Sequence, residues 1–180
     1  ILNEWAKAGE NPLLVAHKDL CNQLRGHPKL DEGIAVAHFM LLRGSNAFED
    51  RSVIFITGRN QLPLDDIERQ ARAIFGNSGN PLGYDDLENL PSDQVEYWLS
   101  KRSPHTASAI TIPAFSDPRV EAVQKKIREA ETVQAIARLR LVWAKYQKRV
   151  FLFSNLPVEM PVDYLTEFND LMPDRLEMEL

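Results

Sequence analysis

The chain has 180 residues, of which 44% are hydrophobic and 26% are charged, a composition typical of one globular domain with a sizeable core. Its formal net charge of −5 argues against a protein that coats nucleic acid non-specifically. The sequence lacks the run of roughly eighteen apolar residues that a membrane-spanning helix needs. The single Cys21 excludes an internal disulfide. We expect a cytoplasmic protein without a membrane partner and, because it begins at Ile1 rather than at methionine, a fragment of a longer protein.

The first third of the chain alternates between helical patterns and short apolar runs. Continuous apolar runs rich in β-branched side chains are typical of buried strands. The clearest run is Ser52–Thr57, which Gly58 follows. In chain order, this region predicts a helix over Ile1–Gly9, a strand over Leu13–Ala16, a helix over Asp19–Arg25, and strands over Gly33–His38 and Ser52–Thr57.

The rest of the chain continues this alternation. Asp117–Pro118 is a strong helix start, because Asp can cap the first turn and Pro suits the first helical position. Apolar residues then recur at helical spacing to about Tyr146. Gly76–Gly83 is rich in Gly and Pro and predicts a loop. In chain order, this region predicts helices over Pro63–Phe75, Asp93–Lys101, Asp117–Tyr146 and Val162–Leu171, and strands over Ala107–Pro113 and Arg149–Phe153.

Strands that alternate with helices indicate βαβ units. We expect an α/β fold of three layers, in which helices flank a mostly parallel sheet of about five strands. The sequence contains no repeat and no linker that divides it. Residues 1–180 are therefore expected to form a single domain, with residues 76–104 as a possible insertion beside the sheet.

Positive charge gathers near the end of the chain. Residues 117–149 contain nine Lys or Arg and four Asp or Glu, whereas residues 155–180 contain seven acids and one Arg. In the basic part, Gln134 and Arg138 are four apart and share a helix face, and Arg140 lies near the helix end. An arginine at a helix end beside a sheet edge can reach phosphate oxygens on a neighbouring domain, as arginine fingers do. A solvated basic helix face is the alternative.

Two polar loops follow predicted strands. The first runs from Arg43 to Asp50, where Gly44 allows close backbone approach and Arg43 and Asn46 can contact phosphate or base. The second follows the clearest strand and offers Arg59 as a phosphate contact. We expect both loops at the sheet edge where α/β proteins place their ligands. For the first loop, an ordinary capped turn is the equal alternative.

Motifs for other chemistries do not occur in the sequence. It has no phosphate-binding Gly-x-x-x-x-Gly-Lys loop, no dinucleotide fingerprint, no paired-cysteine or His-Glu-x-x-His zinc motif and no nucleophile elbow. His17 and His38 both end apolar runs and could be neighbours at one sheet edge. A third ligand is not evident, so we expect hydrogen-bonded histidines and no metal site.

These pieces, in this order, resemble the second RecA-like lobe of a superfamily 2 helicase or translocase. The likeness is greatest to a helicase-related family of bacterial phage and mobile-element replication proteins, and it covers the chain from Pro12 to Pro157. In such helicases the last motif has Gln, then Gly-Arg, then a second Arg. Here Ala137 takes the place of the glycine. The residues that carry the resemblance are Ala37–Phe39, Arg43–Asp50, Ile54–Arg59 and Gln134–Arg140.

The resemblance implies a role for each matching residue. Arg138 or Arg140 would be the arginine finger on the γ-phosphate of ATP, and Gln134 would sense that phosphate. ATP and Mg²⁺ would be bound mainly by a first RecA-like lobe of the same chain, so this fragment alone would be inactive as an ATPase. The residues that would couple the nucleotide state to a bound strand are Arg43, Gly44, Asn46 and Asp50.

The resemblance also implies a nucleic-acid partner, with single- or double-stranded DNA expected. His17 or Lys18 would lie near the nucleic-acid backbone. The alternative is a catalytically silent α/β domain that binds another protein, and the acidic segment Glu159–Leu180 is compatible with such a partner-facing surface.

Overall fold

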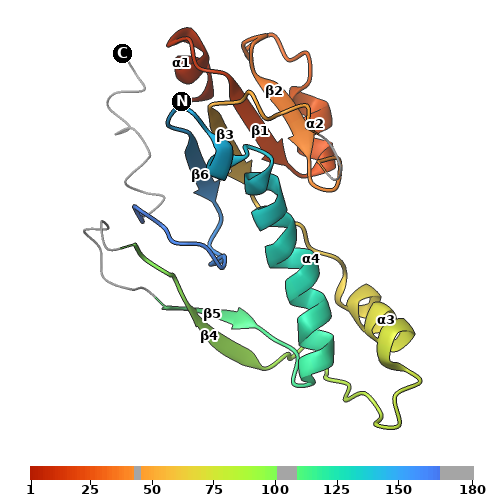
Figure 1. The fold of residues 1–180 in the computed structure, drawn as a ribbon. Helices are drawn as coiled ribbons and strands as arrows, with labels where there is room; N and C mark the ends of the chain where they lie inside the picture. The colour runs from red at the N-terminus through yellow and green to blue at the C-terminus, as the bar shows by residue number, and fades with distance from the viewer. Residues whose placement is uncertain (43–45, 101–108, 167–180) are drawn as a thin grey trace, which may run out of the picture.

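Four short parallel strands form the central sheet of the molecule (Figure 1). The computed structural model describes residues 1–42, 46–100 and 109–166. The prediction of a mostly parallel sheet is confirmed, but among the described residues this sheet has four strands and not the five expected. Their order across the sheet is β2-β1-β3-β6, where β1 spans Pro12–Ala16, β2 Ala35–His38, β3 Val53–Thr57 and β6 Arg149–Phe153.

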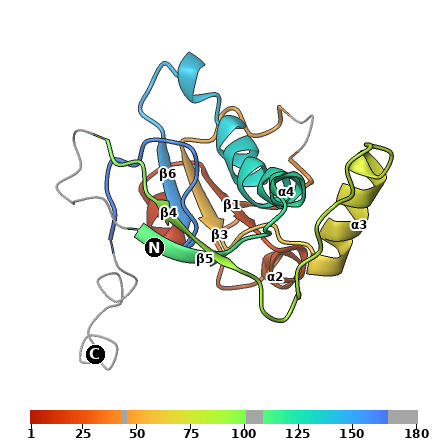
Figure 2. The ribbon, with the colours of Figure 1, turned by 90° about the horizontal axis from the view of Figure 1, so that it is seen from below.

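Helices cover both faces of this sheet, which gives three layers. Leu13 belongs to a buried cluster with Ile136 of α4, whereas its neighbour Leu14 belongs to a cluster with Leu24 of α2. Alternate residues of a strand therefore face opposite layers, as the pleat requires. Figure 2 shows α4 and α2 on opposite sides of the sheet. The helices are α1 (Leu2–Lys7), α2 (Lys18–Leu24) and α4 (Pro118–Ala137).

The first half of α4 extends beyond the sheet and packs against α3, Leu64–Phe75 (Figure 1). Ile67 and Ala71 of α3 are buried in a cluster with Val120 and Val123 of α4. This cluster between α3 and α4 is separate from the two clusters on the faces of the sheet. Among the described residues, every helix is too short or too polar to span a bilayer.

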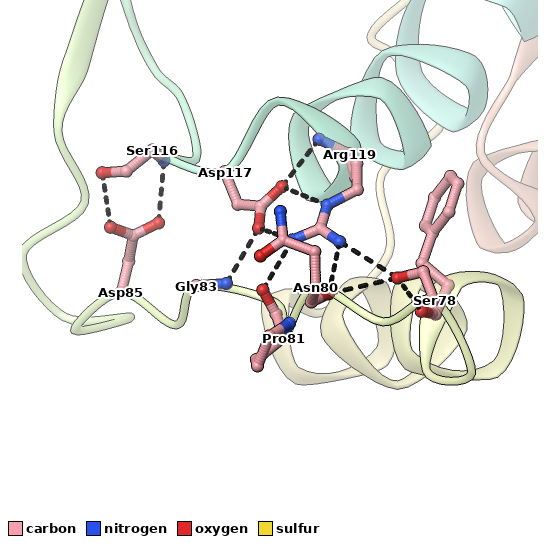
Figure 3. A network of polar contacts seen from close by, with 9 residues as sticks. Ser78, Asn80, Pro81, Gly83, Asp85, Ser116, Asp117 and Arg119 are labelled. Atoms are coloured by element: carbon pink, nitrogen blue, oxygen red, sulfur yellow. Dashed lines mark hydrogen bonds and ion pairs between the residues drawn. The ribbon is translucent and has the colours of Figure 1, made fainter.

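A polar network fixes the loop after α3 to the start of α4 (Figure 3). Asp117 caps α4 by accepting a hydrogen bond from the backbone nitrogen of Arg119 at 2.9 Å, and it accepts another from the backbone nitrogen of Gly83 at 2.8 Å. The Arg119 guanidinium donates to the carbonyl oxygens of Asn80 and Pro81, each at 2.8 Å. The Asp cap predicted from the sequence is confirmed.

A separate antiparallel ribbon corrects two predictions. The helix predicted over Asp93–Lys101 is wrong for residues 93–100, because Ser92–Glu96 forms strand β4; Lys101 lies outside the described residues. Its partner β5, Ala109–Pro113, is a predicted strand that pairs with β4 and so does not join the parallel sheet. The β-branched residues of β5 lie opposite β4, and this long-range pairing outweighs the helical pattern. That residues 76–104 are an insertion stays a prediction.

The chain after β6 is extended where a helix is predicted over Val162–Leu171. Val162 forms a parallel bridge with Leu99. Its backbone nitrogen donates to the carbonyl oxygen of Trp98 at 2.8 Å, and its carbonyl oxygen accepts from Ser100 at 2.8 Å. These bonds hold residue 162 in an extended conformation, so the helix prediction is wrong for residues 162–166; the remainder of that range lies outside the described residues.

α4 ends at Ala137, well before the predicted end near Tyr146. Arg140 has φ 49° and ψ 50°, a left-handed conformation that stops a helix. A short 3₁₀ turn, η1 (Leu141–Trp143), follows it. The apolar periodicity continues past this point, but the chain has to turn in order to enter β6 at Arg149.

Candidate functional site

The two arginines predicted as candidate fingers, Arg138 and Arg140, lie at one edge of the sheet, which we call the amino edge. α4 returns the chain to the start of β6 and so runs antiparallel to the strands, and its last turn reaches this edge (Figure 1). Arg138 is the C-cap residue of α4, and Arg140 follows two residues later. The amino edge is formed by the first residues of the strands, Pro12, Ala35, Val53 and Arg149.

Arg138 has a buried nitrogen that lacks a hydrogen-bond partner in the part of the chain that the structure describes. Its side chain is half-buried, and Nε is shielded from solvent. Buried polar atoms nearly always have a partner, so an unpaired donor marks a place where water or a ligand completes the bonding. Because Nε is shielded, an anionic oxygen would be contacted by the terminal nitrogens of the guanidinium. Gln134, one turn earlier on α4, is exposed.

Arg140 is held by a carboxylate from the chain between β2 and β3. Its Nε lies 3.1 Å from Oε2 of Glu49, and both side chains are about half exposed. An exposed ion pair of this kind contributes only about 0–1 kcal/mol. Arg140 can therefore leave Glu49 for a phosphate at little cost.

Residues 46–51 dock on the end of α4. The Lys148 ammonium donates to the carbonyl oxygen of Glu49 and to that of Leu139, the latter at 2.7 Å. The Tyr146 hydroxyl donates to the carbonyl oxygen of Asp50 at 3.0 Å. Sequence reasoning missed Glu49, Tyr146 and Lys148, because their partners lie nearly a hundred residues away and no local pattern signals such contacts.

Asn46 and Asp50 therefore lie at the amino edge, which corrects the prediction that both polar loops share the opposite edge. A parallel connection has to carry the chain back across the sheet before β3 begins, and residues 46–51 lie at the end of that return. Arg51 donates to the carbonyl oxygen of Gly33, just before β2, at 3.0 Å. Arg43 and Gly44, predicted in the same loop, lie outside the described residues.

The opposite edge, the carboxyl edge, brings together His17, Lys18 and Arg59. Strand order reverses between β1 and β3, and doubly wound sheets bind ligands at such a point. His17 follows β1 and precedes α2, and Lys18 is exposed in the first turn of that helix. Gly58 follows β3 with φ 76°, and a Cβ built on it would lie 3.8 Å from Cδ2 of His17. The loops after the two central strands are thus in contact.

Arg59 lies where the carboxyl edge meets α4. Its Nε donates to Oε1 of Gln61 at 2.8 Å, and the neighbouring Asn60 side chain donates to the carbonyl oxygen of Ile127 on α4 at 3.4 Å. Burial, and after it the nearby Arg128 guanidinium, lower the pKa of Arg59 below its ordinary value. A bound anionic oxygen would offset both the burial of the Arg59 charge and its repulsion by Arg128, so this position is suited to phosphate.

Two histidines at the carboxyl edge, His17 and His38, contact the residue that follows β2. His38 Nδ1 lies 2.6 Å from the carbonyl oxygen of Phe39, and His17 packs edge-on against the Phe39 ring with 6.0 Å between ring centroids. Across the ranges 1–42, 46–100 and 109–166, no group of three or more His, Cys, Asp or Glu is placed to hold a metal ion.

The predicted residues thus divide between two edges. A five-residue strand is about 16 Å long, so no small ligand contacts both edges at once. One edge holds His17, Lys18 and Arg59, and the other holds Asn46, Asp50, Arg138 and Arg140, with Gln134 one turn away. Comparison with protein-family models, with curated proteins and with solved structures finds no match to this chain.

Proposed function

We propose that this chain is the second RecA-like lobe of an ATP-dependent helicase or translocase. In this proposal it supplies arginines to an ATP site that is completed by a first lobe in the same protein. The observation that carries the proposal is the placement of Arg138 and Arg140 together at the C-terminal end of α4, with Nε of Arg138 buried and unpaired among the described residues. A fixed guanidinium aimed across a domain boundary stabilises the charge of a phosphoryl-transfer transition state.

Either arginine could act as the finger. Arg138 is the more rigid of the two, because its side chain is half-buried at the helix end. Arg140 is exposed and exchanges Glu49 for a phosphate more readily. Gln134 would sense the γ-phosphate from the exposed face of α4.

Residues 46–50 would couple the nucleotide state to the bound strand. Their hydrogen bonds to Tyr146 and Lys148 support this role, because a shift of Arg138 or Arg140 would be transmitted to the loop through these contacts. Arg43 and Gly44 complete the proposed loop.

DNA would bind at the carboxyl edge, with His17, Lys18 and Arg59 near the strand backbone. These residues lie at the carboxyl edge of the sheet, whereas the proposed finger lies at the amino edge. Two ligands with separate sites, ATP and nucleic acid, fit this arrangement better than one. The phosphate loop and the Mg²⁺-binding acids would belong to the first lobe, and the whole protein would act in the cytoplasm in DNA replication of a phage or mobile element.

ATP turnover by the full-length protein, with and without single-stranded DNA, tests the proposal against the variants Arg138→Ala and Arg140→Ala. The 180-residue chain by itself is expected to hydrolyse no ATP, because half of a shared site lacks its electrostatic partners. Substantial turnover by this chain alone would contradict the proposal.

A second candidate is a catalytically silent domain that binds another protein. The seven acids among residues 155–180 favour it, since such a segment suits a basic partner. A phosphate-loop motif and an acidic Mg²⁺ motif encoded upstream of Ile1 would exclude this candidate.

A further inference from the structure

The turn after α4 exposes two adjacent large apolar side chains. Val142 is 91% exposed and Trp143 is 78% exposed. Figure 2 shows this turn projecting from the end of α4, away from the sheet. The backbone nitrogen of Trp143 donates to the carbonyl oxygen of Arg140 at 3.0 Å, so an indole and a guanidinium arise from one tight turn. Tryptophan in such a position is typical of a binding surface, because folding gains nothing from exposing it.

The same segment is rich in cations. Residues 138–149 contain five Lys or Arg and no Asp or Glu. Arg140 and Lys145 are exposed on either side of Trp143 in the sequence. Tyr146, which is 51% exposed, follows, and the Lys148 ammonium lies 5.1 Å from the centre of its ring. Cations and exposed rings therefore alternate along this turn.

We propose that this turn is a binding site for single-stranded nucleic acid. Trp143 stacks on a base and Lys145 contacts a phosphate that flanks it. Arg140 contacts the other flanking phosphate in the case where Arg138 serves as the ATP finger. A single strand presents bases and phosphates in alternation, which matches the alternation of rings and cations here. A free nucleotide offers one base and leaves Tyr146 unused. A partner protein would have to present an acidic group and an apolar group at the same point. Every single strand of nucleic acid does so, because it carries a phosphate beside each base.

Two acids from outside the segment pair with its cations among the described contacts: Glu49 with Arg140, and Glu10 with Arg149. Glu49 neutralises Arg140 in the free chain, and a strand phosphate would compete with it for the guanidinium. Lys145 has no such competitor among the described contacts. This site lies at the amino edge and is therefore additional to the strand contact proposed at His17 and Lys18. It does not depend on ATP hydrolysis.

Binding of fluorescein-labelled oligo(dT) to the 180-residue chain at low salt, followed by anisotropy, tests the site. Trp143→Ala is expected to weaken binding by about 5- to 100-fold, and Trp143→Phe to retain most of the affinity. The matched control is Trp98→Ala, because Trp98 is also exposed (60%) but lies beside β4. Its affinity is expected to equal that of the wild type.

The salt dependence separates stacking from charge. Lys145→Gln is expected to reduce the slope of log affinity against log salt concentration by about 0.7, whereas Trp143→Ala leaves the slope unchanged. In the double variant Trp5→Phe, Trp98→Phe, Trp143 is the remaining indole, and oligo(dT) is expected to quench its fluorescence.

The proposal would be overturned by wild-type affinity in Trp143→Ala, by equal losses in Trp143→Ala and Trp98→Ala, or by the absence of oligo(dT) binding at low salt. Quenching of Trp143 by ATP but not by oligo(dT) would also overturn it and assign the turn to the free nucleotide. Strand binding that needs Trp143, in a full-length protein without ATP turnover, would support this site and reject the motor function.

Discussion

The ammonium of Lys148 lies 2.7 Å from the carbonyl oxygen of Leu139 and also donates to that of Glu49. One side chain thus satisfies a carbonyl group at the end of α4 and holds residues 46–51 against it. Unpaired carbonyl groups at helix ends need such partners. Both Arg138 and Arg140 flank Leu139, so their positions depend on this contact.

Replacement of Lys148 by Met should destabilise the fold by about 1–3 kcal/mol, because two carbonyl oxygens lose a charged donor. The amides of residues 49 and 50 should also exchange hydrogen faster, since the loop loses its anchor. Urea unfolding and hydrogen exchange measure the two effects. Lys145→Met, at an exposed neighbouring position, is the matched control and should change neither; equal effects in both variants would contradict the anchor.

Gly58 should resist substitution for a conformational reason rather than a steric one. Its φ of 76° is unfavourable for a residue with a Cβ, but the Cβ of alanine would meet His17 at an ordinary 3.8 Å. Gly58→Ala is therefore expected to cost about 1–2 kcal/mol in unfolding free energy. Gly79→Ala, where a Cβ meets nothing within 4 Å and φ is not positive, should stay within about 0.5 kcal/mol of the wild type. Similar losses at both positions would contradict this explanation.

Asp117 should make stability depend on pH. Its hydrogen bond with the Arg119 side chain, together with those from the backbone nitrogens of Gly83 and Arg119, holds the pKa of this carboxyl well below its ordinary value. A lowered pKa in the folded state adds stability that is complete above the unfolded pKa of about 3.9 and is lost progressively as the pH falls from there through the lower folded pKa. Asp117→Asn should therefore lower the urea midpoint clearly at about pH 6 and by a smaller amount at about pH 2.5.

The control for this pH dependence is Glu96→Gln, an exposed carboxyl on β4. Its effect on the midpoint should be small at both pH values. An Asp117→Asn loss that is as large at the lower pH as at the higher would show that the network in Figure 3 depends on shape and not on the carboxylate charge.

Local patterns were enough to predict the parallel sheet and the start of α4. β3 is a continuous run rich in β-branched residues, which is typical of a buried strand. Asp117 and the proline after it are a specific signal for the start of a helix. β4 could not be predicted in this way, because Ser92–Glu96 has weak strand propensity and becomes a strand only by pairing with β5. The position where α4 ends could not be predicted from local sequence either, because the turn at Arg140 is imposed by the entry of the chain into β6.

The candidate site shows the same limit. The sequence identifies Arg138, Arg140 and Arg59 by type and spacing, but not that the first two lie at one edge and the third at the other. That division follows from the direction of each strand and helix in the finished sheet. Lys148 and Glu49 were missed because their contact joins segments that only tertiary structure brings together.

The most direct test of the proposed function is single-strand-stimulated ATP turnover by the full-length protein and its variants Arg138→Ala and Arg140→Ala. Arg69→Ala serves as the matched control, because Arg69 is exposed on α3 and pairs only with Asp65 and Asp66 of its own helix among the described contacts. We predict that at least one of the two test variants loses on the order of 10³-fold in turnover with nucleotide binding less affected, while Arg69→Ala keeps wild-type turnover. Unchanged turnover in both Arg138→Ala and Arg140→Ala would contradict the account.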